Sequence, residues 1–391
     1  MPQNRTDPSV VALVGPLPPW RSGIADQTLR LARAMKHLGV EPRVFTFRRM
    51  YPAFLYPGKP DSRERRRDFS EGEEGFPAEL GVVRAILDGL NPFSFSSCSR
   101  EIRVSGASLV IVPWWTAYFA PHVLLLFEAI SRSAPDVTKL LLCHNVFDHE
   151  QNPLKSALTR AVLRRADRFV VQNPRSAGEI VSERPDARVD VIPHPSEPRA
   201  VIPDRAAARA RLGVPIDAPV FLFSGLLRPY KGWDVLLDAF PAVRMEFPGA
   251  LLVLGGEPWG EACDLQGRAP AGVRLELHYL SEDERALWFA ACDAVVCPYR
   301  HATGSGIAAD ALAFSRPVIG SAVDGLAEII EEGRSGLFVP PGDARALAVA
   351  MVRFVREGLG PRLSAGAAHR RAVFTPAVHA RRVLSAGGID V

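Results

Sequence analysis

Short apolar runs alternate with amphipathic helical patterns along the chain, which predicts βαβ units that build parallel sheets. The runs are almost continuously apolar, as expected for strands that helices cover on both faces. In the first half, strands are predicted at Val10–Gly15, Arg43–Phe47, Ser108–Val112, Lys139–Asn145, Arg168–Asn173 and in a run ending at His194. In the second half they are predicted at Pro219–Gly225 and in the runs LLVLGG, VRLELHYL, DAVVCPY, RPVIGS and GLFVP. After about residue 343 the pattern is wholly helical. The fold class is therefore α/β, with doubly wound, Rossmann-like sheets.

A chain of 391 residues exceeds one ordinary core and predicts two domains. Four prolines lie close together between the two sets of strands and favour a stiff connector; they are Pro193, Pro195, Pro198 and Pro203. We expect a first domain over 1–195, a hinge over 196–217, a second domain over 218–370, and a helix within 371–391 that packs back on the first domain.

The uncharged segment Leu109–Phe127 approaches the length of a membrane span, which is about 20 residues. Pro113 and Pro121 divide it into a β-branched strand, an aromatic loop and the start of a leucine-rich helix. A buried strand, loop and helix are therefore favoured over a transmembrane helix.

The polar, proline-broken stretch Arg48–Phe76 predicts a long surface loop. Its basic residues have a second interpretation, contact with an anionic membrane or a phosphorylated lipid. These residues are Arg63, Arg65, Arg66 and Arg67. The EGEE run that follows them weakens the second interpretation, and a solvated face is favoured.

Composition narrows the class of protein. Hydrophobic residues make up 47% and charged residues 23% of the chain, as in a globular protein. A net charge of +4 is too small for a dedicated nucleic-acid binder. The five cysteines are scattered and form no CxxC pair, so neither a disulfide framework nor a zinc site is indicated. The N-terminal residues carry no signal-peptide pattern, and a cytoplasmic location, with no secretion, is expected.

The segment Phe223–Phe240 (FSGLLRPYKGWDVLLDAF) is the most informative in the chain. A strand ends at Ser224, Gly225 permits a tight turn, and Arg228 and Lys231 precede a helix. Ligands of open α/β sheets bind at the carboxyl ends of strands, where two such cations would bind phosphate oxygens. The alternative is a basic turn before an amphipathic helix.

A second candidate site lies in Pro298–Ser321, where a small-residue loop follows a strand and opens a helix. Its residues are Thr303, Gly304, Ser305 and Gly306. Glycines admit close approach of a ligand to the backbone, and the free N–H groups of a helix N-terminus attract anions. Asp310, one to two turns into the helix, is a candidate acceptor of hydrogen bonds from ribose hydroxyls. The alternative is a loop that only caps the helix.

In the first half, His144 follows a buried strand and precedes Asn145, at the sheet edge where α/β sites assemble. Such a histidine is either a structural residue or a hydrogen-bond partner of a ligand. His149 and Glu150 are interpreted as helix-start residues. Core packing is favoured for Trp114 and Trp115, with an aromatic surface for an acceptor as the alternative. These two tryptophans lie in the loop of the segment discussed above.

These segments together resemble glycosyltransferase family 4, and the likeness spans nearly the whole chain. The similar stretches are PPWRSGIADQ, CHNVFDHE, VIPHP, GLLRPYKG, GGEPW, LSEDERALWFAACDAVVCPYR and RSGLFVPPGD. The resemblance implies the GT-B fold, two Rossmann-like domains facing across a cleft. It also implies a retaining, metal-independent enzyme that uses a nucleotide-sugar donor and no cofactor.

The resemblance also implies roles for individual residues. Arg228 and Lys231 match the basic pair that binds the donor diphosphate, and His144 matches a histidine close to the transferred sugar. The remaining matches are to donor-binding loop positions and to the ribose acid, which is usually a glutamate. They are Gly23 and Ile24 in the first domain, and Gly225, Thr303, Gly304, Ser305, Gly306, Ile307 and Asp310 in the second.

One position departs from the family pattern. The family's usual E-x7-E motif places a glutamate eight residues before the ribose acid, where this chain has Ala302. Its neighbour His301, or backbone amides, would have to fill that space. The departure concerns recognition of the sugar, and it keeps open a non-catalytic homologue that binds nucleotide sugar in glycan assembly.

The expected function is transfer of a sugar from a nucleotide-diphosphate donor to a glycan or lipid-linked acceptor, as in polysaccharide assembly at the inner face of a membrane. No metal is expected, since two cations and backbone amides offset the diphosphate charge. A dehydrogenase is disfavoured, because no GxGxxG follows the first strand. A sugar-nucleotide epimerase or a phosphorylase on the same fold is a further alternative. The donor, the acceptor and the linkage are not readable from the sequence.

Overall fold

The computed structural model describes residues 9–18, 20, 22–51, 76, 78–148, 152–195, 202–267, 269–302 and 304–391. The chain divides into two compact units, one of Met1–Ile192 with Pro376–Val391 and the other of Pro193–Thr375. Most of the predicted loop over 48–76 lies outside the described residues, as do Arg63, Arg65, Arg66, Arg67, His149, Glu150 and Thr303.

The first unit is a parallel sheet with strand order β3-β2-β1-β4-β5-β6-β7 among the described residues. Its strands are β1 (Val10–Val14), β2 (Glu41–Arg49), β3 (Val83–Asp88), β4 (Leu109–Trp114), β5 (Thr138–Cys143), β6 (Arg168–Val171) and β7 (Arg188–Val191). Its helices are α1 (Gly23–His37), α2 (Phe93–Val104), α3 (Ala120–Ser133), α4 (Pro153–Leu163), α5 (Pro174–Glu183) and α13 (Pro376–Ala386), with short 3₁₀ turns η3 (Ala78–Leu80) and η4 (Ala117–Phe119).

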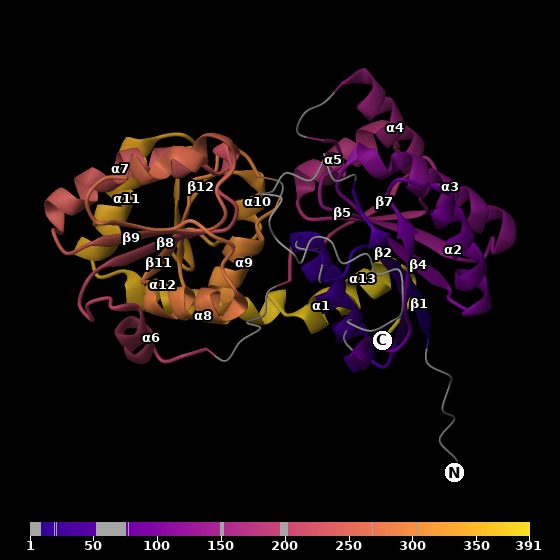
Figure 1. Ribbon diagram of the computed structural model, residues 1–391, viewed down its shortest axis with the longest axis horizontal. Coiled ribbons are helices and arrows are strands. Elements are labelled where there is room, and N and C mark those ends of the chain that lie inside the picture. The colour runs from indigo at the N-terminus through magenta and orange to yellow at the C-terminus, as the bar shows by residue number, and fades with distance from the viewer. Residues whose placement is uncertain are drawn as a thin grey trace, which may run out of the picture. The chain divides into compact units, whose positions relative to one another are not determined.

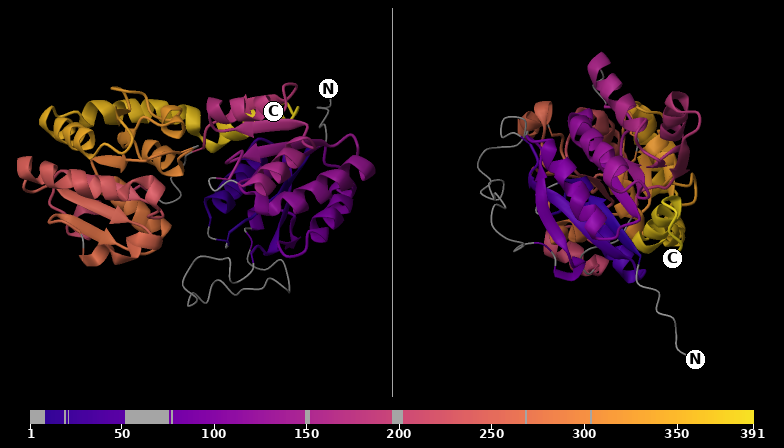
Figure 2. Two further views of the ribbon diagram at one scale, coloured as in Figure 1. Left: turned by 90° about the horizontal axis from the view of Figure 1, so that it is seen from above. Right: turned by 90° about the vertical axis from the view of Figure 1, so that its right-hand side faces the viewer.

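Helices lie on both faces of this sheet (Figures 1 and 2). Alternate residues of β1 enter two separate cores, since Val14 packs on one face and Leu13 on the other. The second face is covered by α1 and by α13, which packs against α1 (Figure 1). Residues Ala380 and Leu384 of α13 are fully buried there. The C-terminal helix therefore belongs to the core of the first unit.

The second unit repeats the architecture with strand order β10-β9-β8-β11-β12-β13, again all parallel. Its strands are β8 (Val220–Ser224), β9 (Leu251–Gly255), β10 (Val273–Glu276), β11 (Ala294–Cys297), β12 (Val318–Ser321) and β13 (Gly336–Val339). Its helices are α6 (Arg205–Leu212), α7 (Trp233–Glu246), α8 (Glu282–Ala291), α9 (Gly306–Ala313), α10 (Asp324–Ala327), α11 (Ala344–Arg356) and α12 (Gly360–Arg371), with 3₁₀ segments η5 (Pro229–Lys231), η6 (Gly260–Gly267) and η7 (Ala372–Phe374).

In each unit the chain first builds the sheet outward in one direction and then crosses to the other side of the starting strand. The order reverses between β1 and β4 in the first unit and between β8 and β11 in the second. Loops leaving neighbouring strands at such a switch point diverge to opposite faces and leave a crevice at the carboxyl edge. The topology therefore locates one candidate ligand edge in each unit.

The predicted strands are confirmed, and the structure adds β3, which the sequence pattern did not reveal. This strand is at the edge of the sheet, and its charged residue Arg84 interrupts the apolar run. The prediction of a strand, loop and helix for 109–127 is also confirmed. However, Trp114 is the last residue of β4 and is almost completely buried, so placing it in an aromatic loop was wrong.

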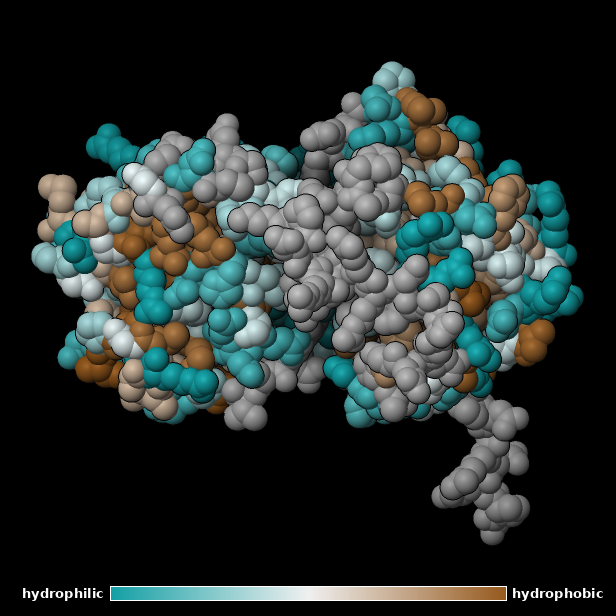
Figure 3. Space-filling model, in the orientation of Figure 1, coloured by the Kyte–Doolittle hydropathy of each residue, from teal (hydrophilic) through white to brown (hydrophobic). Residues whose placement is uncertain are grey.

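The surface and the helices give no sign of a membrane span. Among the described residues, no helix is long and apolar enough to cross a bilayer. On the face shown in Figure 3, hydrophobic and hydrophilic residues are interspersed over the described atoms. Exposed apolar side chains such as Phe93, Leu154 and Met245 are spread over both units, which is usual for globular proteins.

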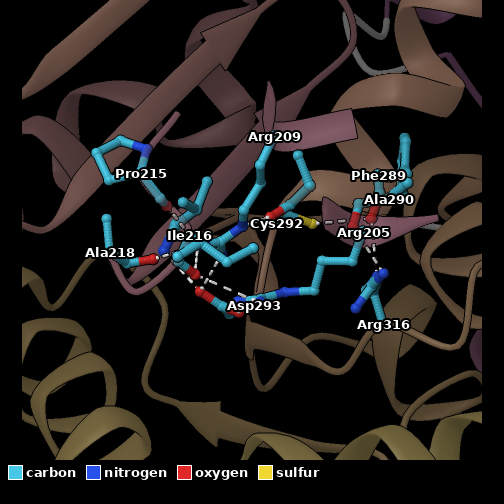
Figure 4. Close-up of polar contacts among 12 residues, drawn as sticks. Arg205, Arg209, Pro215, Ile216, Ala218, Phe289, Ala290, Cys292, Asp293 and Arg316 are labelled. Atoms are coloured by element: carbon cyan, nitrogen blue, oxygen red, sulfur yellow. Dashed lines mark hydrogen bonds and ion pairs between the residues drawn. The ribbon is translucent and has the colours of Figure 1, made fainter. Parts of the chain in front are cut away.

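The segment between the two sets of strands contains α6, which is held on the second unit by a buried arginine (Figure 4). Arg209 is 1% exposed, and its guanidinium donates to the carbonyl oxygens of Pro215, Ile216, Ala218 and Ala291 at 2.7 to 2.9 Å. Asp293 accepts from Arg209, from Arg205 and from the backbone N–H of Val220. These bonds fix α6 at the amino edge of the sheet.

We predict that Asp293→Asn lowers the free energy of unfolding by about 3 kcal/mol, because it leaves the buried guanidinium of Arg209 without a counter-charge. Urea denaturation followed by circular dichroism measures the loss. Asp217→Asn, at an exposed position in the same region, is the control and should stay within about 0.5 kcal/mol of the parent. Equal stability of the two variants would contradict this account of Arg209.

Candidate functional site

In the second unit, the loops that follow β8 and β11 come together at the switch point because glycines let their backbones touch. Gly232 has φ +67°, and a Cβ atom there would lie 2.0 Å from the carbonyl oxygen of Pro298. Arg300 adds two bonds, from its N–H to the oxygen of Tyr230 at 2.8 Å and from its guanidinium to the oxygen of Pro229 at 2.9 Å. The turn after β8 is thus tied to the loop after β11.

Gly225, the first residue after β8, is the point at which three predicted site residues meet. It has φ +99°, and a Cβ atom there would lie 2.9 Å from Lys231 Nζ and 3.3 Å from Ile307 Cγ1. The absence of a side chain lets the ammonium group of Lys231 and the start of α9 share this space. The structure therefore brings Gly225, Lys231 and Ile307 together, although they are distant in sequence.

Arg228 and Lys231 provide two positive charges without carboxylate partners among the described residues. The guanidinium carbon of Arg228 lies 4.2 Å from the ring centre of Trp259, and Lys231 Nζ lies 5.9 Å from that of Tyr299. Burial lowers the pKa of Lys231 from 10.5 to about 8, and the charges of Arg228 and Arg285 act in the same direction. An anion bound here would relieve the repulsion between these cations.

The N-terminus of α9 lies beside these cations and is shaped by Ser305. The Ser305 hydroxyl accepts from the N–H of Ala308 at 3.1 Å, and it lies 3.2 Å from the buried hydroxyl of Tyr299. Ser305 thus caps the helix, as the capping-only interpretation expected. Gly306 is exposed, and a Cβ atom there would meet no atom within 4 Å. The open space before the first turn, together with the helix dipole, suits a phosphate group.

Asp310 lies in α9 and is held by Arg285 of α8. The two side chains form an ion pair, and Asp310 is 7% exposed. The carboxylate predicted to accept from ribose hydroxyls therefore already has a charged partner within the chain. Its role toward a ribose remains a prediction.

The position of the missing family glutamate is occupied by backbone and by an aromatic stack. Ala302 packs against the core of the unit, and its carbonyl oxygen accepts from the N–H of Gly325 at 3.0 Å. The exposed ring of His301 stacks on Tyr230, with ring centres 5.3 Å apart and planes inclined by 22°. His301 therefore presents an imidazole, and not a carboxylate, at the surface of this loop.

In the first unit, Gly23 and Ile24 open α1 directly after the loop that follows β1. Ser22 caps the helix by accepting from the N–H of Ala25 at 3.0 Å. Trp20 anchors the preceding loop through a bond from its indole N–H to the carbonyl oxygen of Phe47 at 2.9 Å. Gly23 is exposed and has no atom within 4 Å of the place of a Cβ, so the chain itself does not require glycine there.

His144 follows β5, and Gln172, which follows β6, orients its ring. The amide nitrogen of Gln172 lies 3.0 Å from His144 Nδ1. Donation from this amide makes Nδ1 the acceptor and leaves the proton on Nε2. Burial, together with the nearby His379 of α13, lowers the pKa of His144 to about 3. The imidazole is therefore neutral near pH 7 and suited to donate a hydrogen bond.

The sequence reasoning missed several residues that complete these sites. Trp259, Tyr299 and Arg285 surround the cations of the second unit, and Gln172 and His379 lie beside His144. Trp259 stood in the GGEPW stretch and Gln172 at a strand end, which are signals of a site. His379 and Arg285 lie within helices, and no local pattern marks their approach to the site.

The described residues include no group of three or more His, Cys, Asp or Glu side chains arranged to hold a metal ion. Four buried cysteines are free thiols: Cys98, Cys143, Cys292 and Cys297. Burial raises the pKa of Cys297, which ends β11, to about 12, so this thiol is neutral near pH 7.

Comparison with known proteins gives matches in both units. Residues 22–195 match the family model "Glycosyl transferase 4-like domain", and residues 218–357 match "Glycosyl transferases group 1". A D-inositol 3-phosphate glycosyltransferase of a Nocardioides species is 34% identical over 247 residues, covering 57% of this chain and 54% of the relative. One of Mycobacterium bovis is 30% identical over 243 residues, covering 58% and 50%. The chain thus spans about half the length of the curated relatives it matches.

Solved structures share the fold at low sequence identity. Sucrose-phosphate synthase from Thermosynechococcus elongatus has a TM-score of 0.74 at 18% identity, covering 96% of this chain and 98% of its own. The Anabaena protein HepE, solved in complex with UDP, has a TM-score of 0.72 at 16% identity, with the same coverage. These likenesses concern the arrangement of both units.

We predict that Lys231→Met raises the free energy of unfolding at pH 7, because the parent protein holds a charged ammonium where its environment disfavours charge. The folded-state pKa of about 8 lies below the ordinary 10.5, so the charge penalty is full below pH 8 and disappears as the pH rises toward 10.5. The advantage of the variant should shrink over that window. Urea denaturation at pH 7 and pH 10 measures it.

The control is Lys155→Met, which removes a lysine paired with Asp148 at 3.4 Å on the first unit. It should bring no gain in stability at pH 7. A loss of stability in Lys231→Met at pH 7 would contradict the assignment of Lys231 as an uncompensated cation.

Proposed function

The chain belongs to the family 4 type of glycosyltransferases and has the GT-B fold, and we propose that it transfers a sugar from a nucleoside-diphosphate sugar to an acceptor hydroxyl group. One observation carries the proposal: two cations without carboxylate partners among the described residues, Arg228 and Lys231, lie beside the open N-terminus of α9 at the switch point. A diphosphate offers the matching charge. The Anabaena structures with UDP and with UDP-glucose support this class of donor.

The proposed chemical role of the site is stabilisation of the leaving group. When the bond between the anomeric carbon and the diphosphate oxygen breaks, negative charge grows on the departing nucleotide. Arg228, Lys231 and the amides at Gly306 and Ile307 are placed to stabilise this charge, and they do so without reorganisation. Lys231 is mostly protonated at pH 7 because its pKa is about 8. These groups supply positive charge of the kind that a metal would otherwise provide.

The other proposed roles follow the same division of residues. In the second unit, Gly225, Gly304 and Ser305 shape the phosphate loop, with Thr303 as a further candidate outside the described residues. In the first unit, Gly23 and Ile24 border the donor and His144 donates from Nε2 to a hydroxyl of the transferred sugar. Asp310 accepts from the ribose while Arg285 holds its carboxylate.

Retention of the anomeric configuration and a glycan or lipid-linked acceptor complete the proposal. The curated relatives are named for D-inositol 3-phosphate, so polyol phosphates belong among the acceptors to test. A reducing, cytoplasmic setting suits the four free thiols. NMR of the product's anomeric proton distinguishes retention from inversion.

A second candidate is a homologue that binds nucleotide sugar without transferring it, and Ala302 motivates it. Without a carboxylate at this position, contacts to the sugar depend on His301 and backbone groups. Release of nucleoside diphosphate that depends on an added acceptor would support the transferase. Tight binding of donor with no turnover on glycan, polyol-phosphate and lipid-linked acceptors would favour the binding protein.

We predict that a nucleoside diphosphate stabilises the protein without added metal, by about 2.7 kcal/mol at 100 times its Kd. Arg228→Ala and Lys231→Ala should each weaken binding at least about tenfold, since each removes a charge-assisted contact to phosphate. Thermal denaturation with UDP, GDP and ADP in the presence of EDTA measures this. Arg211→Ala, at an exposed position of α6, is the matched control and should bind as the parent does. A folded parent protein that binds no nucleotide would refute the proposal.

We predict that Gly306→Ala separates folding from binding. No atom lies within 4 Å of the added Cβ, so stability should be unchanged or rise by about 0.5 kcal/mol. Nucleotide affinity should fall at least about tenfold, because the methyl group occupies the approach to the first amides of α9. Gly178→Ala, in α5 and equally open, is the control that should leave affinity unchanged. Unchanged affinity in Gly306→Ala would remove α9 from the proposed site.

A further inference from the structure

Arg228 lacks the partners that normally hold a buried arginine. Its Nε–H is buried and forms no hydrogen bond, and the guanidinium forms no ion pair with the described residues. Its recorded side-chain partner is the ring of Trp259, which lies 4.2 Å from the guanidinium carbon. The position of this cation therefore depends on an aromatic face.

Trp259 is fixed relative to Arg228 because the loops that carry them continue the parallel pairing of β8 with β9 beyond the strand ends. Gly225 donates to the carbonyl oxygen of Gly255 at 2.9 Å, and Leu227 donates to that of Glu257 at 3.0 Å. A bridge pairs Leu227 with Pro258, one residue before the tryptophan. The register of this ladder sets the indole over the guanidinium.

An aromatic face and a carboxylate hold an arginine in different ways. A carboxylate binds the in-plane N–H groups and neutralises the charge. An indole attracts the flat face of the guanidinium through its quadrupole and leaves the charge and the in-plane donors available. The second arrangement suits a cation that has to bind a phosphate group.

The same unit contains the opposite arrangement. Arg209, at the amino edge of the sheet, has its donors occupied by four carbonyl oxygens and by Asp293. That guanidinium is saturated and holds α6 in place. The contrast shows that this fold can saturate a buried arginine, and that Arg228 is held without saturation.

We propose that Trp259 is a positioning residue for the donor site: it holds Arg228 by its aromatic face so that the guanidinium stays charged and keeps its in-plane N–H groups available to the diphosphate. This inference deepens the proposed function and rests on it. Trp259 acts through Arg228 and is not itself a catalytic residue.

The test compares Trp259→Phe, Trp259→Leu and Trp259→Glu by calorimetric titration with the nucleoside diphosphate that stabilises the parent. Phenylalanine keeps an aromatic face and should bind within about threefold of the parent, whereas leucine should raise Kd about tenfold. Glutamate should raise Kd at least as much as leucine, because it pairs with Arg228 and neutralises it. Trp259→Met is a second non-aromatic variant if the leucine variant folds poorly.

Two controls separate positioning from a general effect on the loop. In the Arg228→Ala background, Trp259→Leu should cause no further loss of affinity, because its effect passes through Arg228. In the nucleotide-free protein, the Arg228 side-chain N–H resonances should shift upfield from the ring current of the indole. That shift should disappear in Trp259→Leu, as read from spectra with ¹⁵N-labelled arginine.

The outcomes distinguish the two proposals. Parent-like affinity in Trp259→Leu, or losses that add to that of Arg228→Ala, would overturn the role of Trp259 while leaving the donor site intact. Absence of the upfield resonances in the parent would overturn it without reference to any nucleotide. A parent protein that binds no nucleotide would overturn the proposed function, and the role of Trp259 in donor binding with it.

Discussion

The close approach of three backbone segments at the carboxyl edge of the second sheet is the constraint on which the candidate site depends. A Cβ atom at Gly256 would lie 2.0 Å from the carbonyl oxygen of Gly225, and one at Gly232 would lie equally close to that of Pro298. Both glycines have positive φ, which other residues rarely adopt. Because side chains are absent there, the loops after β8, β9 and β11 touch through their backbones, and the groups they carry are placed to within the tolerance of hydrogen bonds.

This scaffold holds positive charge that it does not neutralise. Lys231 is held where burial opposes its charge, and Arg228 is held by an indole face. The rest of the unit provides the stability that this arrangement costs: the strands are buried on both faces, and Arg209 saturates its donors at the opposite edge. A functional edge and a structural edge thus lie at the two ends of one sheet, which is the usual division of roles in α/β domains.

The parallel sheets could be predicted from the sequence because their strands are continuous apolar runs, and the cations because Arg228 and Lys231 follow such a run. The edge strand β3 could not, since Arg84 breaks its pattern. The partner of Asp310 was also missed, because Arg285 lies on a different helix and only tertiary packing brings the two together. Trp259 stood in a conspicuous turn, but its stacking on Arg228 depends on the register between β8 and β9, which no single segment encodes.

The return of α13 to the first unit has a consequence for synthesis of the protein on the ribosome. One face of the first sheet is closed by Ala380, Val383 and Leu384, which are translated after the whole of the second unit. Until then, apolar residues of β1, β4 and β5 such as Leu13, Ile111 and Leu140 lack part of their cover. The second unit is continuous in sequence and can complete its core as soon as it emerges. The unit that begins first is therefore finished last, and its incomplete sheet is the nascent surface that a chaperone would have to shield.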